Sequence, residues 1–121
     1  MRLFALRGAV SVERNDAPAI VSATEALMRE IMQRNGIGPG DVVSCIFTAT
    51  DDLDAEFPAL AARNLGFERV PLLCAREIPK PGALASVIRV LIHFHADEGH
   101  HPHHVYLGAA RALRADLDAA Q

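Results

Sequence analysis

One long helix constrains the fold of this chain more than any other feature. Apolar side chains recur at helical spacing between Ile20 and Met32, as on the buried face of an amphipathic helix. Asn15-Asp16 supplies a helix cap before this segment, and Pro18 suits the first helical turn. Asn35-Gly36 tolerates a left-handed backbone, which predicts the end of the helix.

The rest of the chain consists mainly of short strand-like runs bounded by turn residues. A second, shorter helix is expected from Phe57-Pro58 to Gly66, and the last residues have weak helical character. The sequence therefore predicts an α+β (α/β-like) fold, with a mixed sheet of about five strands, one long helix and one or two short helices. With 121 residues and no linker or repeat, we expect a single domain over residues 1–121. The expected strands are residues 3–12, 42–48, 69–77, 85–95 and 104–107.

Composition narrows the possible functions. Half of the residues are hydrophobic, which allows a real core, and the net charge of -3 argues against nucleic acid or a membrane surface as a partner. No apolar run approaches the ~20 residues that span a bilayer, and Arg7 interrupts the N-terminal stretch that most resembles an export signal. Cys45 and Cys74 form no CxxC pair and indicate a reducing, cytoplasmic environment.

Two charged residues stand where a buried strand usually has aliphatic ones. Glu77 ends the third strand-like run, and Arg89 lies between Ile88 and Val90 in the fourth. Charges are seldom placed against apolar neighbours unless they pair with each other or bind a ligand. The alternative is an arginine on an edge strand, whose methylene chain packs against apolar neighbours while its guanidinium stays in water.

Six histidines lie between His93 and His104 and suggest a metal site. Imidazoles bind zinc or copper when the fold brings three or four of them together. Neighbouring side chains on an extended chain point in opposite directions, however, and no spaced Cys, Asp or Glu set completes a site. A solvated loop is the favoured interpretation, with no metal.

Covalent chemistry finds little support in the sequence. There is no G-x-S-x-G pattern, phosphate loop or dinucleotide fingerprint. Cys74 would need an activating histidine to act as a nucleophile. The arginines are more informative, because guanidinium groups that converge on one site suit a small substrate with two carboxylates. On residue chemistry alone, the chain is a globular α/β domain that binds a small polyanion.

Taken together, these segments resemble the small trimeric chorismate mutases, the class distinct from the all-helical one. The resemblance runs nearly end to end and rests on fragments that occur in the same order in the chain. They are L-R-G-A-V-S-V-E-R-N, T-A-T-D-D-L-D-A-E-F-P-A, V-P-L-L-C-A-R-E-I, I-R-V-L and H-V-Y-L-G-A-A-R-A-L-R-A-D-L.

The resemblance implies an isomerase that converts chorismate to prephenate, on the route to phenylalanine and tyrosine. It also implies a homotrimer that resembles an α/β barrel, with active sites between neighbouring subunits and no cofactor.

By this resemblance, four residues carry the reaction. Arg7 matches the family's carboxylate-binding arginine, and Arg89 matches the cation beside the breaking ether oxygen. Cys74 and Glu77 match the pair that hydrogen-bonds the ring hydroxyl.

The remaining site residues are expected to bind substrate. Tyr106 matches a phenol that meets the side-chain carboxylate, and Arg114 matches a tail arginine near the mouth of the site. The wall from the adjacent subunit and the rest of the binding set correspond to Phe57, Ala59, Arg63, Leu72, Leu73 and Leu113.

Two departures from the family pattern leave alternatives open. The family often has a basic residue where this chain has Leu60, and E-G-H-H-P-H-H replaces a loop in which only His104 fits the pattern. A trimeric protein of the same shape that binds small anions without catalysis is one alternative. A metal-binding module built on the histidine cluster is the other.

Overall fold

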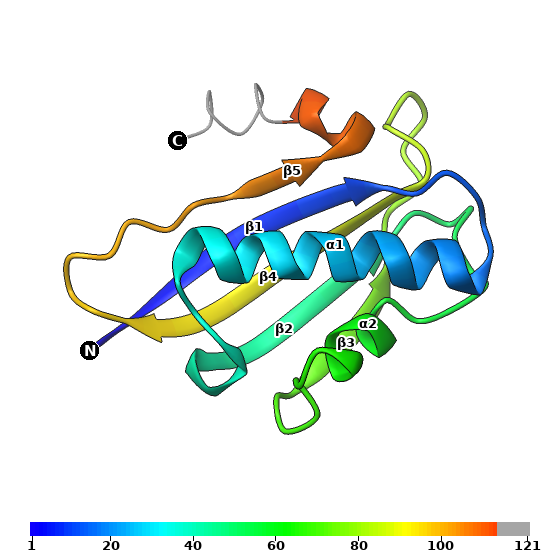
Figure 1. Ribbon diagram of the computed structural model, residues 1–121. Helices are drawn as coiled ribbons and strands as arrows, with labels where there is room; N and C mark the ends of the chain where they lie inside the picture. Colours follow the sequence, from blue (N-terminus) through cyan, green and yellow to red (C-terminus); the bar gives the residue numbers. More distant parts are fainter. Residues whose placement is uncertain (114–121) are drawn as a thin grey trace.

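The computed structural model describes residues 1–113, which form a five-stranded sheet with helices packed against it (Figure 1). The strands are β1 (Arg2–Ser11), β2 (Val42–Ala49), β3 (Leu72–Arg76), β4 (Val87–Ala96) and β5 (Val105–Leu107), in the order β3-β2-β4-β1-β5. Strand β4 is antiparallel to both neighbours, whereas β3 and β5 pair in parallel with β2 and β1. The predicted α+β fold with a mixed sheet is confirmed.

Helix α1 (Ala17–Asn35) begins and ends at the predicted caps. The Asp16 carboxylate accepts a hydrogen bond from the Ala19 backbone N–H at 2.8 Å, which satisfies one of the free donors of the first turn. At the other end Gly36 has φ 61, a left-handed conformation that costs glycine little, and its N–H bonds back to helix carbonyls.

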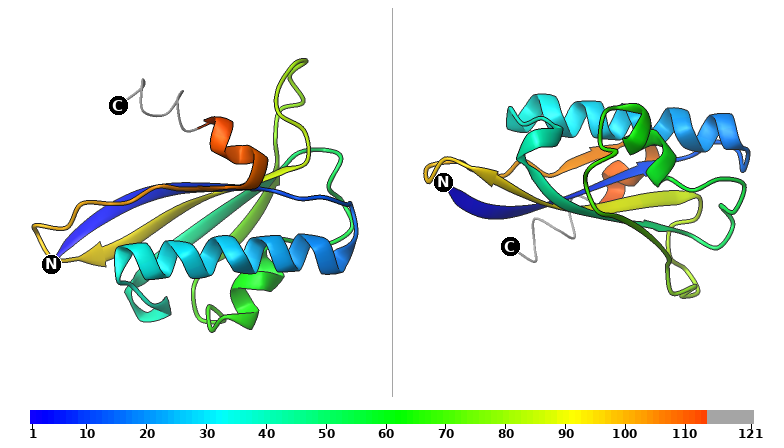
Figure 2. Two further views of the ribbon diagram at one scale, coloured as in Figure 1. Left: turned by 45° about the horizontal axis from the view of Figure 1, so that its top comes forward. Right: turned by 90° about the horizontal axis from the view of Figure 1, so that it is seen from below.

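Both α-helices lie on one face of the sheet, which we call the inner face (Figure 2). Short helix α2 (Ala59–Asn64) packs beside α1 there. The approach is close at Gly8, where a Cβ atom would lie 2.8 Å from Ile31 Cδ1 and 3.2 Å from Leu27 Cδ1. The largest buried side chains of the core are Leu6, Ile20, Leu27, Met28, Ile31, Phe47, Phe67, Ile88, Ile92, Phe94, Val87 and Val105.

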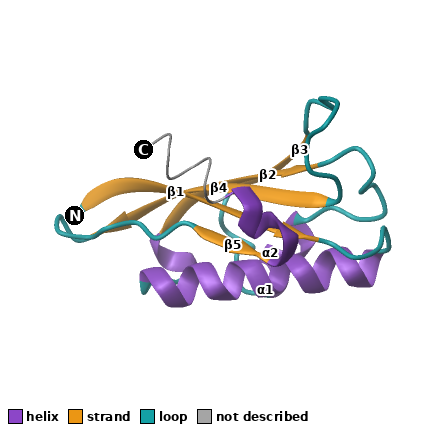
Figure 3. Cartoon of the chain, turned by 90° about the horizontal axis from the view of Figure 1, so that it is seen from above, coloured by secondary structure: helices purple, strands orange, loops and turns teal. Residues whose placement is uncertain are grey.

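The opposite, outer face of the sheet is largely uncovered. A 3₁₀ turn at Gly108–Ala112 and the loop between β3 and β4 rise on this side (Figures 2 and 3). Ala110 of that turn packs against Ala9 and Val87. Elsewhere the face exposes aliphatic side chains, with Leu3 52% and Leu73 61% exposed.

Element boundaries differ from the expected ones by a few residues. The third strand begins at Leu72 rather than at residue 69, because Val70 closes a turn onto the Phe67 carbonyl and Pro71 has no N–H to donate. Helix α2 begins after Pro58, and the tail forms a 3₁₀ turn before the described residues end. None of the helices in residues 1–113 has the length and apolarity needed to cross a bilayer.

Candidate active site

A single row of residues crosses the outer face, one from each strand. Strand register places Ala75, Thr48, Arg89, Ala9 and Tyr106 side by side. Arg89 occupies the middle of the row because β4 is the central strand. Paired residues of neighbouring strands project to the same side of a sheet, so these five side chains share the outer face.

Glu77 and Arg89 form an ion pair across this row. The Glu77 side chain is 17% exposed and that of Arg89 34%, so both charges are partly withdrawn from water. The second carboxylate oxygen of Glu77 accepts a hydrogen bond from the Thr48 hydroxyl at 2.6 Å. The interpretation that the two strand charges are paired is confirmed. The edge-strand alternative is wrong, because Arg89 lies on a central strand.

Arg7 lies on the same face, next to the row. It pairs with Leu91, two residues along β1 from Ala9. The Arg7 backbone N–H donates to Nδ1 of His104 at 3.0 Å, just before β5 begins, and the residue is exposed. A second cation therefore lies on the outer face with Arg89.

Two further candidates, Tyr106 and Leu113, lie at the β5 end of the row. Tyr106 pairs with Ala9, and both Tyr106 and Leu113 pack against the cluster of Ala9, Val87 and Ala110. Arg114 lies outside the described residues.

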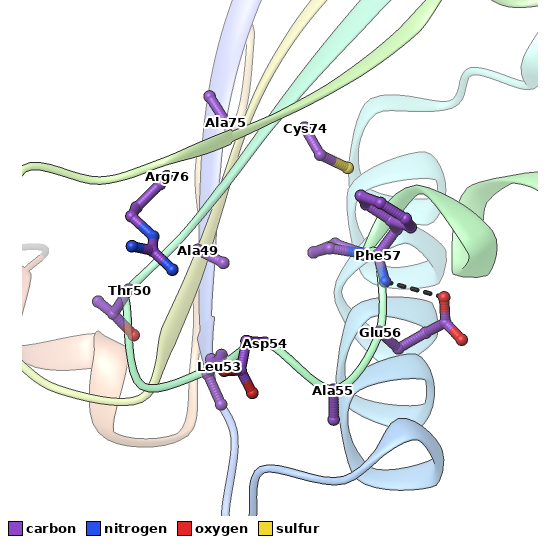
Figure 4. Close-up of a pocket in the computed structure, with 11 residues that line it drawn as sticks. Ala49, Thr50, Leu53, Asp54, Ala55, Glu56, Phe57, Cys74, Ala75 and Arg76 are labelled. Carbon is purple, nitrogen blue, oxygen red and sulfur yellow. Dashed lines mark hydrogen bonds between the residues drawn. The ribbon is translucent and has the colours of Figure 1, made fainter.

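Several of the other candidate residues lie at the inner face instead. Phe57, Cys74 and Arg76 line a cavity of about 340 Å³ between the segment after β2 and strand β3 (Figure 4). Phe57 is 68% exposed, whereas Ala59 is only 3% exposed and packs within the core of its own chain.

Arg63 lies exposed on α2, on the inner side of the sheet. The structure therefore does not bring Phe57, Ala59 and Arg63 to the Arg89 row within one chain.

Strand alternation divides the candidates on β3 between the two faces. Leu72 and Cys74 pair with the buried residues Cys45 and Phe47, so their side chains face inward. Leu73, between them, projects from the outer face. The Cys74 thiol lies on the side of Phe57 (Figure 4), so within one chain it does not point toward the Glu77 carboxylate.

The other cysteine, Cys45, lies in the buried core. Cys45 is 1% exposed, and burial raises the pKa of its thiol to about 12. Neither cysteine is in a disulfide.

The histidine-rich loop is tied to the end of α1 through Asn35. The buried Asn35 side chain bonds both the N–H and the carbonyl of His103, and its Oδ1 lies 3.3 Å from Nε2 of His100. The His100 ring also meets Phe4 and Phe94 edge-on, with ring centroids 5.4 Å apart in each case. Within residues 1–113 no three His, Cys, Asp or Glu side chains come together in a way that could hold a metal ion.

Sequence reasoning missed Thr48 as a site residue. A sequence signal for it was present, because Thr48 carries a hydroxyl group in the otherwise largely apolar run V-V-S-C-I-F-T. Its significance depends on β2 lying between β3 and β4, which no local pattern reveals.

Comparison with known proteins identifies the class of protein to which this chain belongs. The sequence model of chorismate mutase type I matches residues 3–117, and the chain belongs to this family. Its relatives include chorismate mutase AroH of Thermus thermophilus, 47% identical over 96% of this chain and 97% of the relative. Chorismate mutase AroH of Bacillus subtilis (strain 168) is 39% identical over 97% of this chain and 94% of the relative.

The solved structures agree with the sequence comparison. The structure of a chorismate mutase from Clostridium thermocellum superposes with a TM-score of 0.88 at 45% identity, covering 91% of this chain and 99% of that chain. The family resemblance seen in the sequence is thereby confirmed.

Proposed function

We propose that this protein is an isomerase that rearranges chorismate to prephenate, at the branch toward phenylalanine and tyrosine. The observation that carries the proposal is the partly buried Glu77–Arg89 pair in the middle of the outer face, with Arg7 on the same face. Family membership supports this activity over binding without catalysis.

The rearrangement is intramolecular: one carbon–oxygen bond breaks while one carbon–carbon bond forms. No proton has to move, and no covalent intermediate is required. The first task of the protein is to hold a flexible dicarboxylate in its compact reactive conformer. Arg7, Arg63 and Arg114 are the proposed carboxylate-binding cations, and Tyr106 is a proposed hydrogen-bond donor to one carboxylate.

The second task is to stabilise charge that develops only in the transition state. The ether oxygen becomes partly negative as its bond to carbon breaks, and a fixed guanidinium at that oxygen gains more then than in the ground state. Arg89 is the proposed cation. Arginine suits the role because it stays charged in a partly desolvated site and offers a rigid fork. Glu77 would accept the substrate's ring hydroxyl and hold Arg89 in place, without acting as a general base.

A homotrimer would complete the site. Ala59 and Arg63 of α2, and Phe57 just before it, lie on the inner side of the sheet. The Arg89 row lies on the outer side, so a second copy would be needed to bring the two groups together. The uncovered aliphatic residues Leu3 and Leu73 support burial of the outer face against neighbouring subunits.

In that trimer, three sheets with their helices outside would resemble an α/β barrel. The Cys74 thiol would contact substrate held on the outer face of a neighbouring subunit, or the Cys74 backbone would contact substrate in its place. Leu72, Leu73 and Leu113 would shape the pocket around the ring. We propose that residues 1–121 form one such domain, and that the protein is cytoplasmic, where thiols stay reduced.

Leu60 is the main departure from the family pattern near the site. It is half-buried on α2, one turn before Arg63. Arg63 would therefore supply the attraction for substrate carboxylate that a basic residue at position 60 otherwise shares.

A single assay separates the candidate functions. Chorismate consumption is followed by absorbance, with and without a chelator. Loss of chorismate that is insensitive to chelator is expected for the mutase. Absence of consumption would indicate a binding protein, and strict metal dependence would favour the histidine-cluster module.

A further inference from the structure

We infer that Thr48 is a positioning residue for the reaction, which holds the Glu77 carboxylate in place while Arg89 acts on the substrate. The inference rests on the proposed function, because it takes Glu77 and Arg89 as the reacting pair. Its physical basis is the arrangement of three neighbouring strands on the outer face.

Glu77 and Arg89 belong to strands that do not touch each other. Glu77 follows β3, Arg89 lies on β4, and β2 runs between them. Two strand spacings separate the backbones, which is about 9–10 Å. The ion pair can form only where both side chains reach across β2.

Thr48 is the β2 residue at the crossing point. It is paired with Arg89 on one side and with Ala75, two residues before Glu77, on the other. Its hydroxyl donates to Oε2 of Glu77 at 2.6 Å, while Oε1 of the same carboxylate meets Arg89 Nη1. The two carboxylate oxygens of Glu77 therefore have different partners, the Thr48 hydroxyl for one and the Arg89 guanidinium for the other.

This division of partners matters once substrate binds. When the Arg89 guanidinium also contacts the ether oxygen, it divides its charge between the substrate and Glu77, so the ion pair alone would hold the Glu77 carboxylate less firmly. Threonine is branched at Cβ and restricted at χ1, so its hydroxyl is a rigid support. A bond from Thr48 to the ionised carboxylate keeps Glu77 aimed at the ring hydroxyl and at Arg89.

The test is a double-mutant cycle between positions 48 and 77. Thr48→Val is nearly isosteric and removes only the hydroxyl, and Thr48→Ser retains it. Hydrogen bonds to charged groups are stronger than neutral ones, so Thr48→Val should lower kcat/KM about tenfold or more. Thr48→Ser should stay within about threefold of the unmodified enzyme.

The cycle separates positioning from structural support. In a Glu77→Ala background, Thr48→Val should have almost no further effect, since the hydroxyl then has no carboxylate to hold. Where turnover in that background is too slow, calorimetric binding of prephenate gives the same comparison. An equal loss in both backgrounds, or no loss in either, would overturn the inference.

Ser44→Ala is the matched control. Ser44 lies on the same strand, and its hydroxyl contacts His93 at 3.1 Å. We expect it to leave kcat/KM unchanged, and a loss equal to that of Thr48→Val would refute a specific role for Thr48.

A second readout does not require activity. The NMR signal of the Arg89 side-chain Nε–H, in protein without ligand, should show faster solvent exchange in Thr48→Val than in Thr48→Ser. Chorismate consumption by the unmodified protein tests the proposed function separately. An active enzyme with unchanged Arg89 exchange in Thr48→Val would refute the inference about Thr48 alone.

Discussion

Arg89 lies on the central strand β4, with the buried residues Ile88 and Val90 on either side of it in sequence. A charge in this position is held by two kinds of constraint. The strand fixes its backbone through pairing on both sides, and Glu77 fixes the guanidinium. A preorganised cation of this kind needs little reorganisation when negative charge develops beside it.

Removing the Arg89 side chain tests this role. We expect Arg89→Ala to lower kcat/KM by at least ~10²-fold, which is the scale for loss of one preorganised donor. Arg89→Lys should recover only part of the rate, because an ammonium lacks the planar fork. Steady-state kinetics on chorismate measure both. Near-normal turnover in the alanine variant would count against Arg89 as the catalytic cation.

The cap of α1 gives a prediction about pH. The Ala19 backbone N–H, followed by the Arg14 side chain, holds the pKa of the Asp16 carboxyl below its ordinary value. A lowered folded-state pKa adds stability above the unfolded pKa of about 4, and this stability is lost as pH falls through the folded pKa. Asp16→Asn keeps the cap oxygen but has no acid to titrate.

Urea denaturation at a series of pH values checks this effect. Between about pH 5 and about pH 3, the free energy of unfolding should fall less steeply for Asp16→Asn than for the unmodified protein. Parallel curves for the two proteins would contradict a cap that depends on the ionised carboxylate.

At the scale of elements, the end of α1 depends on backbone conformation at one residue. Gly36 has φ 61, and a Cβ added there would meet nothing within 4 Å, so only backbone strain opposes a side chain. Gly36→Ala should therefore lower the free energy of unfolding by about 1–2 kcal/mol.

Gly38 provides the control for this prediction. A Cβ at this position would also meet nothing within 4 Å, and its φ of -124 is open to any residue. Gly38→Ala should leave the urea midpoint nearly unchanged. Equal losses from the two substitutions would show that left-handed strain at Gly36 is not the cause.

Local sequence patterns predicted most elements because each has its own signal. The caps at Asp16 and Gly36 and the alternation through Arg89 depend on neighbours within a few residues, and the structure agrees with each. The face of the sheet from which the Cys74 side chain projects was harder to predict from local sequence. It depends on the register of β3 against β2, which is a long-range pairing.

The candidate site was predictable only in part, for the same reason. Glu77 and Arg89 were recognised as charges out of place among apolar residues, and the structure pairs them. The support from Thr48 and the link between Arg7 and His104 join residues that are far apart in sequence. Neither follows from residue type or spacing alone.

At the scale of the whole molecule, the sheet separates the candidate residues into two groups. Arg89, Glu77 and Arg7 belong to the outer face, whereas Arg63 and Phe57 belong to the side covered by the helices. Under the proposed function, one chain would therefore hold two incomplete parts of a site. In a cyclic trimer, each outer face would be completed by the neighbouring subunit.

Mixing two defective variants tests this central claim most directly. Arg89→Ala and Arg63→Ala are each expected to be impaired, and they are unfolded together and refolded as an equal mixture. A site is intact only where a subunit with Arg89 adjoins a neighbour with Arg63, so one half times one half, about a quarter, of the sites should regain full activity. Chorismate consumption near a quarter of the unmodified rate is the predicted result. Activity no higher than the mean of the two separate variants would contradict a site shared between subunits.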